Sequence, residues 1–263
     1  MKACILASGS SGNCTYVAAG ETKILIDAGI SLARIDRELK AIGADSEGMD
    51  ALILSHEHGD HCRELSRVAL ALECPIYLSA RTLPHVRWAL SDHEAIHTFR
   101  VGESFPIGDL QVETFRVFHD SVDPCGFLIG GPSHCDGGGR TRLAIATDLG
   151  TVTPPLKQLL RVCEALIIEA NHDLNMLMNG RYPWDLKQRI RSPVGHLSND
   201  QAAELIRELT QQGALKKAIL AHLSQQNNRP DLALSAVQSR LDSLFHCDVY
   251  LSYQDQRSEV LEI

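Results

Sequence analysis

Residues 56–61 read His56-Glu57-His58-Gly59-Asp60-His61, and five of these six side chains can bind a metal ion or move a proton. Because side chains alternate along an extended segment, His56 and His58 are expected on one side of it. Asp60 and His61 follow where the chain turns and can face a neighbouring point in space. A tract this dense in histidine and aspartate predicts a metal site rather than an exposed acidic turn. It suits two metal ions about 3.5–4 Å apart, which can clamp both oxygens of a displacement at phosphorus or carbon.

The flanking sequence places this motif on rigid elements. Residues 50–55 form an apolar, β-branched run of strand length, and residues 62–72 have the pattern of an amphipathic helix. The motif therefore begins at the end of a buried strand and leads into a helix, an arrangement that holds ligands in place.

Length and composition favour an ordinary globular α/β protein. The chain has 263 residues, is 44% hydrophobic and carries a formal net charge of −8. We expect a single domain over residues 1–263, built from two αβ halves, roughly 1–150 and 151–263. The longest apolar runs are strand-sized, which excludes a membrane-spanning helix, and the first residues do not have a signal-peptide pattern. The negative charge argues against a generally basic nucleic-acid binder but permits an enzyme with a local basic strip.

Cysteine usage indicates the compartment. The chain has eight cysteines and no CxxC pair. A cysteine-type zinc site is therefore not expected, and we interpret the cysteines as reduced thiols of a cytoplasmic protein.

Strand and helix patterns alternate along the chain. Helices are predicted at 31–42, 61–72, 154–162, 198–212 and 231–244. Strands are predicted at 2–7, 14–19, 22–27, 50–55, 75–78, 125–130, 142–147, 164–169, 216–221, 247–252 and 258–262, with a hairpin over 104–117. Residues 130–139, which include His134 and Cys135, are predicted as a long hairpin loop. The pattern indicates two packed sheets with helices on the outside.

Three further ligand candidates come directly after apolar strands. His119 follows residues 112–118, Asp148 follows 143–147 and His222 follows 218–221. Each is a residue type that binds zinc or a related metal. A single polar residue at a strand end means little, but three of them together with residues 56–61 indicate one converging site.

With these residues the chain resembles the metallo-β-lactamase superfamily, whose HxHxDH motif matches residues 56–61. The resemblance implies a four-layer αββα sandwich with two divalent metal ions, zinc or manganese with iron as a further option, at one edge of the sheets. It implies that the first ion is held by His56, His58 and His119. It implies that the second is held by Asp60, His61 and His222, with Asp148 bridging. Asp27, the early aspartate of the pattern, would orient the motif.

Other stretches resemble the YycJ/WalJ-type group of this superfamily. They are residues 7–13, 169–173, 181–187 and 195–199. The resemblance implies a 5′-to-3′ DNA exonuclease with a DNA-repair role, DNA ends as substrate and repair proteins as partners. Digestion polarity, strand preference and oligomeric state stay open.

The expected catalytic residues are His196 and Asp60. A water shared by two cations would lose a proton near neutral pH and attack phosphorus. His196 lies where phosphodiesterase relatives place a histidine that is not a ligand, and we expect it to protonate the leaving oxygen. Ser198 or Asn199 is expected to cap helix 198–212, whose N-terminus would favour phosphate.

Five residues are candidate substrate contacts: Ser10, Asn13, His172, Asn199 and Lys187. Ser10 and Asn13 lie in a Gly/Ser loop suited to phosphate, for which a plain tight turn is the alternative. Lys187 lies in the stretch 181–191, where cations alternate with aromatic residues as a nucleic-acid strand requires. A solvated helix face is the alternative there, and an ordinary loop histidine is the alternative for His172.

The main rival function is hydrolysis of a small, cyclic phosphodiester. The DNA exonuclease and the small-molecule phosphodiesterase are distinguished by whether residues 181–191 line the metal cleft. Thioester or β-lactam hydrolysis would use the same metals, but His196 and the Gly/Ser loop count against it. A non-catalytic scaffold is disfavoured because a buried, unpaired ligand cluster is costly without its metal.

Overall fold

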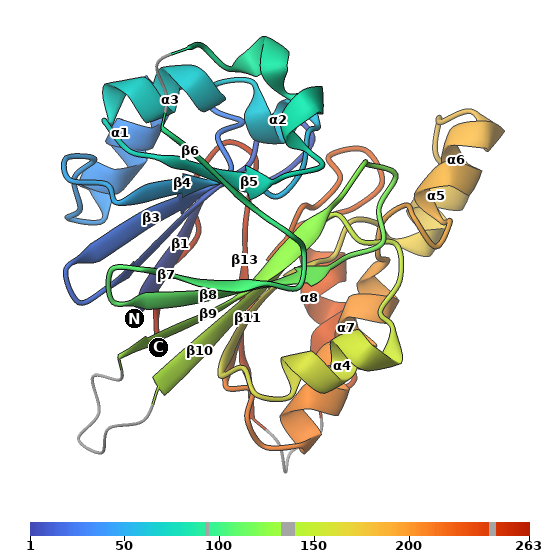
Figure 1. Ribbon diagram of the computed structural model, residues 1–263. Helices are drawn as coiled ribbons and strands as arrows, with labels where there is room; N and C mark the ends of the chain where they lie inside the picture. Colours follow the sequence, from blue (N-terminus) through green and yellow to red (C-terminus); the bar gives the residue numbers. More distant parts are fainter. Residues whose placement is uncertain (93–94, 133–139, 242–245) are drawn as a thin grey trace.

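Two seven-stranded sheets face each other in the structure, a computed structural model that describes residues 1–92, 95–132, 140–241 and 246–263. The strand order is β14-β1-β2-β3-β4-β5-β6 in the first sheet and β13-β12-β11-β10-β9-β8-β7 in the second. Helices lie on the outer face of each sheet (Figure 1). The predicted four-layer αββα sandwich is therefore confirmed.

The first sheet is antiparallel at one end and parallel at the other. Strands β1 to β3 are antiparallel, and β3 to β6 are parallel because helices connect most of them. The two chain ends meet, since β14 pairs with β1 and the Met1 amino group donates to the Ile263 carbonyl. The strands are β1 (Lys2–Ala7), β2 (Cys14–Ala19), β3 (Thr22–Ile26), β4 (Ala51–Ile53), β5 (Ile76–Ser79), β6 (Ile96–Phe99) and β14 (Leu261–Glu262).

The second sheet repeats this division. Strands β7 to β10 form antiparallel hairpins, and β10 to β13 run parallel through helical crossovers. The strands are β7 (Ser104–Ile107), β8 (Leu110–Arg116), β9 (Cys125–Pro132), β10 (Arg140–Ala146), β11 (Ala165–Glu169), β12 (Lys217–Ala221) and β13 (Asp248–Leu251).

The helices differ in how they contact the sheets. Helices α1 (Leu32–Ala41) and α3 (Leu65–Ala71) cover the first sheet, while α4 (Pro154–Leu160), α7 (Asn199–Gln211) and α8 (Pro230–Gln238) cover the second. The short helix α2 (Gly59–Cys62) contains part of the histidine motif, and single 3-10 turns lie at Leu83–His85 and Arg87–Ala89. Helices α5 (Leu174–Asn179) and α6 (Trp184–Ile190) project from the body (Figure 1). Among the described residues, no helix combines the length and apolar character needed to cross a bilayer.

The central core lies between the sheets and draws on both. Ile5 and Ile24 of the first sheet pack with Phe127, Ile145 and Ile167 of the second, and all five side chains are buried. Each buried side chain of this size contributes roughly 1.5–3 kcal/mol. Because successive strand residues point to opposite faces, alternate positions such as Leu25 and Leu166 pack instead under the outer helices. The sandwich thus fixes the strand ends from which the site is built.

Several predicted elements differ from the structure. Helix 61–72 is divided into α2 and α3, and β6, α5 and α6 were not predicted. The predicted division near residue 150 is wrong for the sheets, because the chain crosses to the second sheet at residues 100–103. The seven described cysteines are free and buried. β9 and β10 pair as a hairpin, whereas His134 and Cys135 lie outside the described residues.

Candidate metal centre and adjoining cavity

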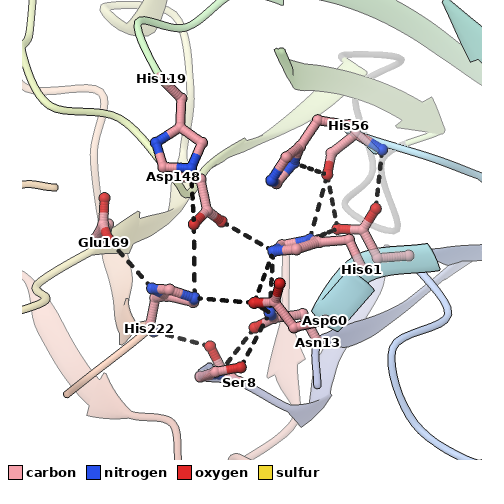
Figure 2. A network of polar contacts seen from close by, with 12 residues as sticks. Ser8, Asn13, His56, Asp60, His61, His119, Asp148, Glu169 and His222 are labelled. Atoms are coloured by element: carbon pink, nitrogen blue, oxygen red, sulfur yellow. Dashed lines mark hydrogen bonds and ion pairs between the residues drawn. The ribbon is translucent and has the colours of Figure 1, made fainter. Parts of the chain in front are cut away.

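Titratable side chains from four strand ends converge at one edge of the two sheets. His56 and His58 follow β4, His119 follows β8, Asp148 follows β10 and His222 follows β12. Figure 2 shows Asp148 between His119, His61 and His222. The predicted candidates are therefore close together in space although they span most of the sequence.

Three residues at strand ends of this region have left-handed backbone conformations. Asp27, Asp148 and His222 have φ values of 64°, 55° and 57°. For residues with a side chain this conformation costs roughly 1 kcal/mol or more, and it persists where the surroundings over-determine it. Each of the three follows a strand directly or by one residue. The left-handed step turns the chain sharply and directs the side chain along the sheet edge.

Close backbone packing fixes the position of α2. The Asn13 amide donates to the Asp60 carbonyl at 2.8 Å, and the Ala28 amide donates to the His61 carbonyl at 2.7 Å. A Cβ atom on Gly29 would lie only 1.6 Å from the Asp60 carbonyl oxygen. Glycine is therefore required at position 29, because any side chain would displace the segment that carries Asp60 and His61.

The first candidate metal group consists of His56, His58 and His119, whose ligand atoms lie within 4.8 Å of one another. His119 Nδ1 lies 3.1 Å from the Gly195 carbonyl oxygen, which leaves Nε2 as its ligand atom. His56 Nδ1 lies 3.0 Å from the Ser55 hydroxyl, and its buried Nε2 has no hydrogen-bond partner among the described residues. Such contacts fix the ring orientation of a metal-binding histidine.

The second candidate group consists of Asp60, His61 and His222, again within 4.8 Å. His61 Nδ1 lies 2.7 Å from Asp27 Oδ2, and Asp27 is itself held by the backbone amide and hydroxyl of Ser55. The Nε2 atoms of His61 and His222 lie 3.5 and 3.8 Å from Asp60 Oδ2. This arrangement agrees with the orienting role expected for Asp27.

Asp148 lies between the two groups. Its Oδ2 is 3.2 Å from His61 Nε2, and its Oδ1 is 3.9 Å from His119 Nε2 and 3.6 Å from His222 Nε2. The side chain is 4% exposed. A buried carboxylate whose oxygens lie near histidines of both groups is placed to bridge two cations.

The donor set fits divalent metal ions. Buried polar atoms normally have hydrogen-bond partners, yet the Nε2 atoms of His56 and His222 have no hydrogen-bond partner within the described part of the chain. Imidazole nitrogens combined with carboxylate oxygens suit zinc, and also manganese or iron. The unpartnered nitrogens are therefore explained if each binds a cation.

Electrostatics without metal supports the same conclusion. Burial disfavours a charged ring, but Asp27 and Asp148 outweigh it and raise the pKa of His61 well above its usual value. Burial is likewise opposed by Asp148 at His222, whose pKa is also raised. At His56, burial and the nearby His61 lower the pKa. Cations would displace protons from His61 and His222, so metal affinity must rise with pH.

Glu169 lies within the same cluster of side chains, although the sequence patterns gave it no role. It is fully buried at the end of β11, and its Oε1 lies 2.5 Å from His196 Nδ1 and 3.2 Å from His222 Nδ1. Burial opposes its ionisation, yet His196 and His222 lower its pKa to about 2. The sequence signal for Glu169 is that a single acidic residue comes directly after the apolar run 165–168.

His196 links the metal centre to a cavity. Burial lowers the pKa of His196, but the nearby Glu169 carboxylate outweighs burial and raises it. Because Glu169 contacts Nδ1, the Nε2 atom of His196 is left to contact a substrate. The His196 side chain is 21% exposed and its Nδ1 lies 3.8 Å from Asp148. The cavity measures about 190 Å³, and its lining residues include Ser10, Asp120, Asn171, Tyr182, Arg189, His196 and Ser224.

Residues 174–191, which we call the α5–α6 arm, form one wall of this cavity. Tyr182, Leu186, Arg189 and Ile190 line it. The Arg189 guanidinium pairs with Asp120 at 2.5 Å, and Asp120 Oδ1 lies 3.3 Å from His119 Nε2. The arm is therefore tied to the loop that carries a candidate ligand.

The five predicted substrate contacts differ in how far they are exposed to the cavity. Ser10 lines the cavity, whereas Asn13, His172, Asn199 and Lys187 are all buried. The Lys187 ammonium donates to the Met178 and Gly180 carbonyls, so it holds the arm together instead of meeting a phosphate.

The other three side chains are also engaged or enclosed. Asn13 donates to Asp60 Oδ2 at 3.2 Å, and Asn199 exchanges hydrogen bonds with Asn228. Burial lowers the pKa of His172 to about 4, which keeps its ring neutral. These residues position the site from within. The predicted helix cap is confirmed, since Ser198 and Gln201 form a reciprocal capping box on α7.

Comparisons with known proteins place the chain among proteins of one superfamily. A family model described as beta-lactamase superfamily domain matches residues 22–223. The chain is 34% identical over 245 residues to a Bacillus anthracis protein named exodeoxyribonuclease YycJ, covering 90% of this chain and 88% of that protein. It is 35% identical over 242 residues to exodeoxyribonuclease WalJ of Streptococcus pneumoniae, covering 90% and 87%. The crystal structure of the metallo-beta-lactamase fold protein YhfI from Bacillus subtilis superposes with a TM-score of 0.73 at 18% identity, over 99% of both chains.

The class defined by the fold and the site is therefore the metallo-β-lactamase superfamily, to which this chain belongs. Within that superfamily the chain belongs to the YycJ/WalJ-like group.

Proposed function

We propose that this protein is a two-metal phosphodiester hydrolase that acts on DNA ends as a 5′-to-3′ exonuclease. The observation that carries the proposal is the position of Asp148, which lies between two candidate metal groups and 3.8 Å from His196. Two-metal sites of this kind stabilise both the attacking and the leaving oxygen of an in-line displacement. The names of the two relatives add support for a DNA substrate.

Each residue has a defined task in this proposal. When bound, the two cations activate water and offset negative charge on the phosphate oxygens. Asp60 and Asp148 would supply carboxylate ligands to these ions. Glu169 holds Nδ1 of His196, so His196 donates its other proton to the leaving oxygen. Ser10 lines the same cavity, where its hydroxyl can contact a phosphate oxygen.

The arm favours a nucleic-acid strand over a small cyclic phosphodiester. Tyr182 and Arg189 line the cavity that contains His196, the proposed proton donor beside the metal centre. This position supports the DNA substrate, because the two substrates are expected to differ in whether residues 181–191 line the metal cleft. Trp184 is 56% exposed on the same arm, and Arg181 and Arg191 are also exposed. Aromatic faces and cations together bind single strands by stacking and charge. The chain as a whole has a formal net charge of −8, so the arginines of the arm form a local basic strip on an acidic protein.

The cellular setting completes the proposal. We infer that the protein works in the cytoplasm with zinc or manganese, with iron as a further option, and serves DNA repair together with repair proteins. We also infer that residues 1–263 act as one domain, because the central core joins residues of both sheets.

Digestion of a linear duplex tests the proposal. The duplex carries a 5′-phosphate and a 3′-label, and the protein is reconstituted with zinc or manganese. The proposal predicts a ladder that shortens from the 5′ end and disappears in His58→Ala, while His246→Ala, which changes an exposed histidine, retains it. An intact duplex together with hydrolysis of bis(p-nitrophenyl) phosphate would overturn the DNA assignment and favour a small phosphodiester.

A further inference from the structure

A second, larger cavity adjoins the one that contains His196. It measures about 380 Å³, and its lining includes Gln225, Tyr253, Gln254 and Gln256. Ser224 lines both cavities. The two cavities therefore adjoin each other at Ser224.

Backbone contacts connect the second cavity to the metal centre. Ser224 is two residues after the candidate ligand His222. The Ser8 hydroxyl accepts a hydrogen bond from the His222 amide at 2.8 Å, and the Ser8 amide donates to the Tyr253 carbonyl at 3.1 Å. Tyr253 is thus joined to the metal-binding strand end through one intervening residue.

Gln254 makes this region rigid. Its Oε1 accepts a hydrogen bond from the Ser11 amide at 2.8 Å, and its Nε2 donates to the Gly12 carbonyl at 3.0 Å. Both contacts hold the loop that carries Ser10, a residue of the first cavity. The two cavities consequently share a fixed wall, and a strand crossing from one to the other would meet a preformed surface.

The chemistry of the second cavity suits a base and not a phosphate. Among the described residues that line it, Asp255 is the single charged side chain, so it offers no cation to a phosphate. The side-chain amides of Gln225 and Gln256 are exposed and form no hydrogen bond with the described part of the chain. Tyr253 adds a half-buried ring. Amides read the edges of bases, and aromatic rings stack on their faces.

We propose that this cavity is a nucleobase subsite, which holds a base of the substrate strand next to the phosphate under attack. The inference rests on the proposed function, because it requires a nucleic-acid substrate. Tyr253 would stack on the base, and Gln225 and Gln256 would contact its edge. The cavity beside His196 would then hold the phosphate under attack and the nucleotide to which that phosphate belongs.

Abasic substrates test this subsite. A set of 5′-phosphorylated oligonucleotides carries one abasic residue at each of the first four positions in turn, and kcat/KM is measured for wild type, Tyr253→Leu and Gln226→Ala. Gln226 is exposed and does not line the cavity, so its variant is the matched control. Thermal unfolding and metal content establish that each variant is folded and loaded.

Stacking of one base changes affinity by about tenfold or more. We therefore expect one abasic position to lower kcat/KM of wild type and Gln226→Ala by about tenfold. For Tyr253→Leu, kcat/KM on the intact strand should be about tenfold lower than for wild type. The abasic residue at the sensitive position should then cause no further decrease. Equal abasic penalties in wild type and Tyr253→Leu would overturn the subsite alone. A wild-type protein that cleaves bis(p-nitrophenyl) phosphate but no oligonucleotide would overturn the proposed function and the subsite together.

Discussion

The strand-end metal centre and the α5–α6 arm are built in opposite ways. At the metal centre, side chains such as Asp148 and His222 are almost completely buried and are fixed by several partners and by left-handed backbone. On the arm, Trp184 is 56% exposed, and two short helices are joined by the Lys187 ammonium. Under the proposed function, the chemistry lies where the fold is most constrained, whereas the proposed contacts to the substrate extend from a locally supported element.

The largest effect is expected at the centre of the constrained region. Asp148→Asn keeps the size of the side chain and tolerates the left-handed backbone, but removes the bridging charge. Hydrolysis of bis(p-nitrophenyl) phosphate by metal-reconstituted protein should fall on the order of 10⁴-fold. Asp231→Asn, at an exposed ion pair, is the control. Activity within tenfold of wild type would show that Asp148 does not bridge the ions.

Removal of the proton donor should have a smaller and substrate-dependent effect. His196→Ala is expected to lower kcat on DNA by about 10²–10⁴-fold, because the leaving alkoxide requires a proton. The loss should be much smaller with bis(p-nitrophenyl) phosphate, whose leaving group is a weak base. His246→Ala, with a side chain 88% exposed, controls for loss of a histidine. An equal loss on both substrates would contradict the proton-donor role.

Burial of His172 should appear in the pH dependence of stability. Burial lowers its pKa to about 4, so between that value and its usual 6.5 the unfolded chain binds a proton that the folded chain does not. The free energy of unfolding should therefore decrease as pH falls from 6.5 to 4, by at most about 3 kcal/mol from this group. In metal-free protein, urea unfolding of His172→Gln should lack this part of the pH dependence. His85→Gln, at an exposed site, should retain it, and the same slope in both variants would contradict the assignment.

The smallest effect is expected on the arm. Lys187→Met removes an ammonium that donates to two carbonyls, and the loosened arm should lower DNA degradation by about tenfold. Hydrolysis of bis(p-nitrophenyl) phosphate should change by less than about twofold, because the metal groups do not include Lys187. Lys216→Met, with a side chain 69% exposed, is the control. An equal loss on both substrates would show that the arm supports the metal centre itself.

The candidate ligands were predictable because each comes directly after an apolar run of strand length. His119, Asp148 and His222 needed only the rule that chemistry collects at strand ends, and the structure brings them together. The αββα layers followed from the resemblance and from the alternation of strand and helix patterns. The predicted boundary between the sheets, near residue 150, does not match the structure, because the hairpin strands β7 to β10 belong to the second sheet. The order of strands and helices along the sequence does not show which strands pair.

The substrate contacts were less predictable, for a physical reason. Lys187 belongs to a basic stretch, but local geometry turns its ammonium toward two carbonyls. Composition gives the charge of such a segment and not the direction of each side chain. Helices α5 and α6 have six and seven residues, too few for a clear helical period. Glu169 was missed because its partners, His196 and His222, are far away in sequence.

Metal stoichiometry tests the central claim most directly, since the claim is that four strand ends hold two ions around Asp148. Metal-free protein is loaded with zinc at neutral pH, and bound metal per chain is measured by native mass spectrometry for wild type, His58→Ala and His246→Ala. We predict two ions in wild type and His246→Ala, and one in His58→Ala, which lacks a ligand of the first group alone. A single ion in wild type, or two ions retained in His58→Ala, would contradict the account.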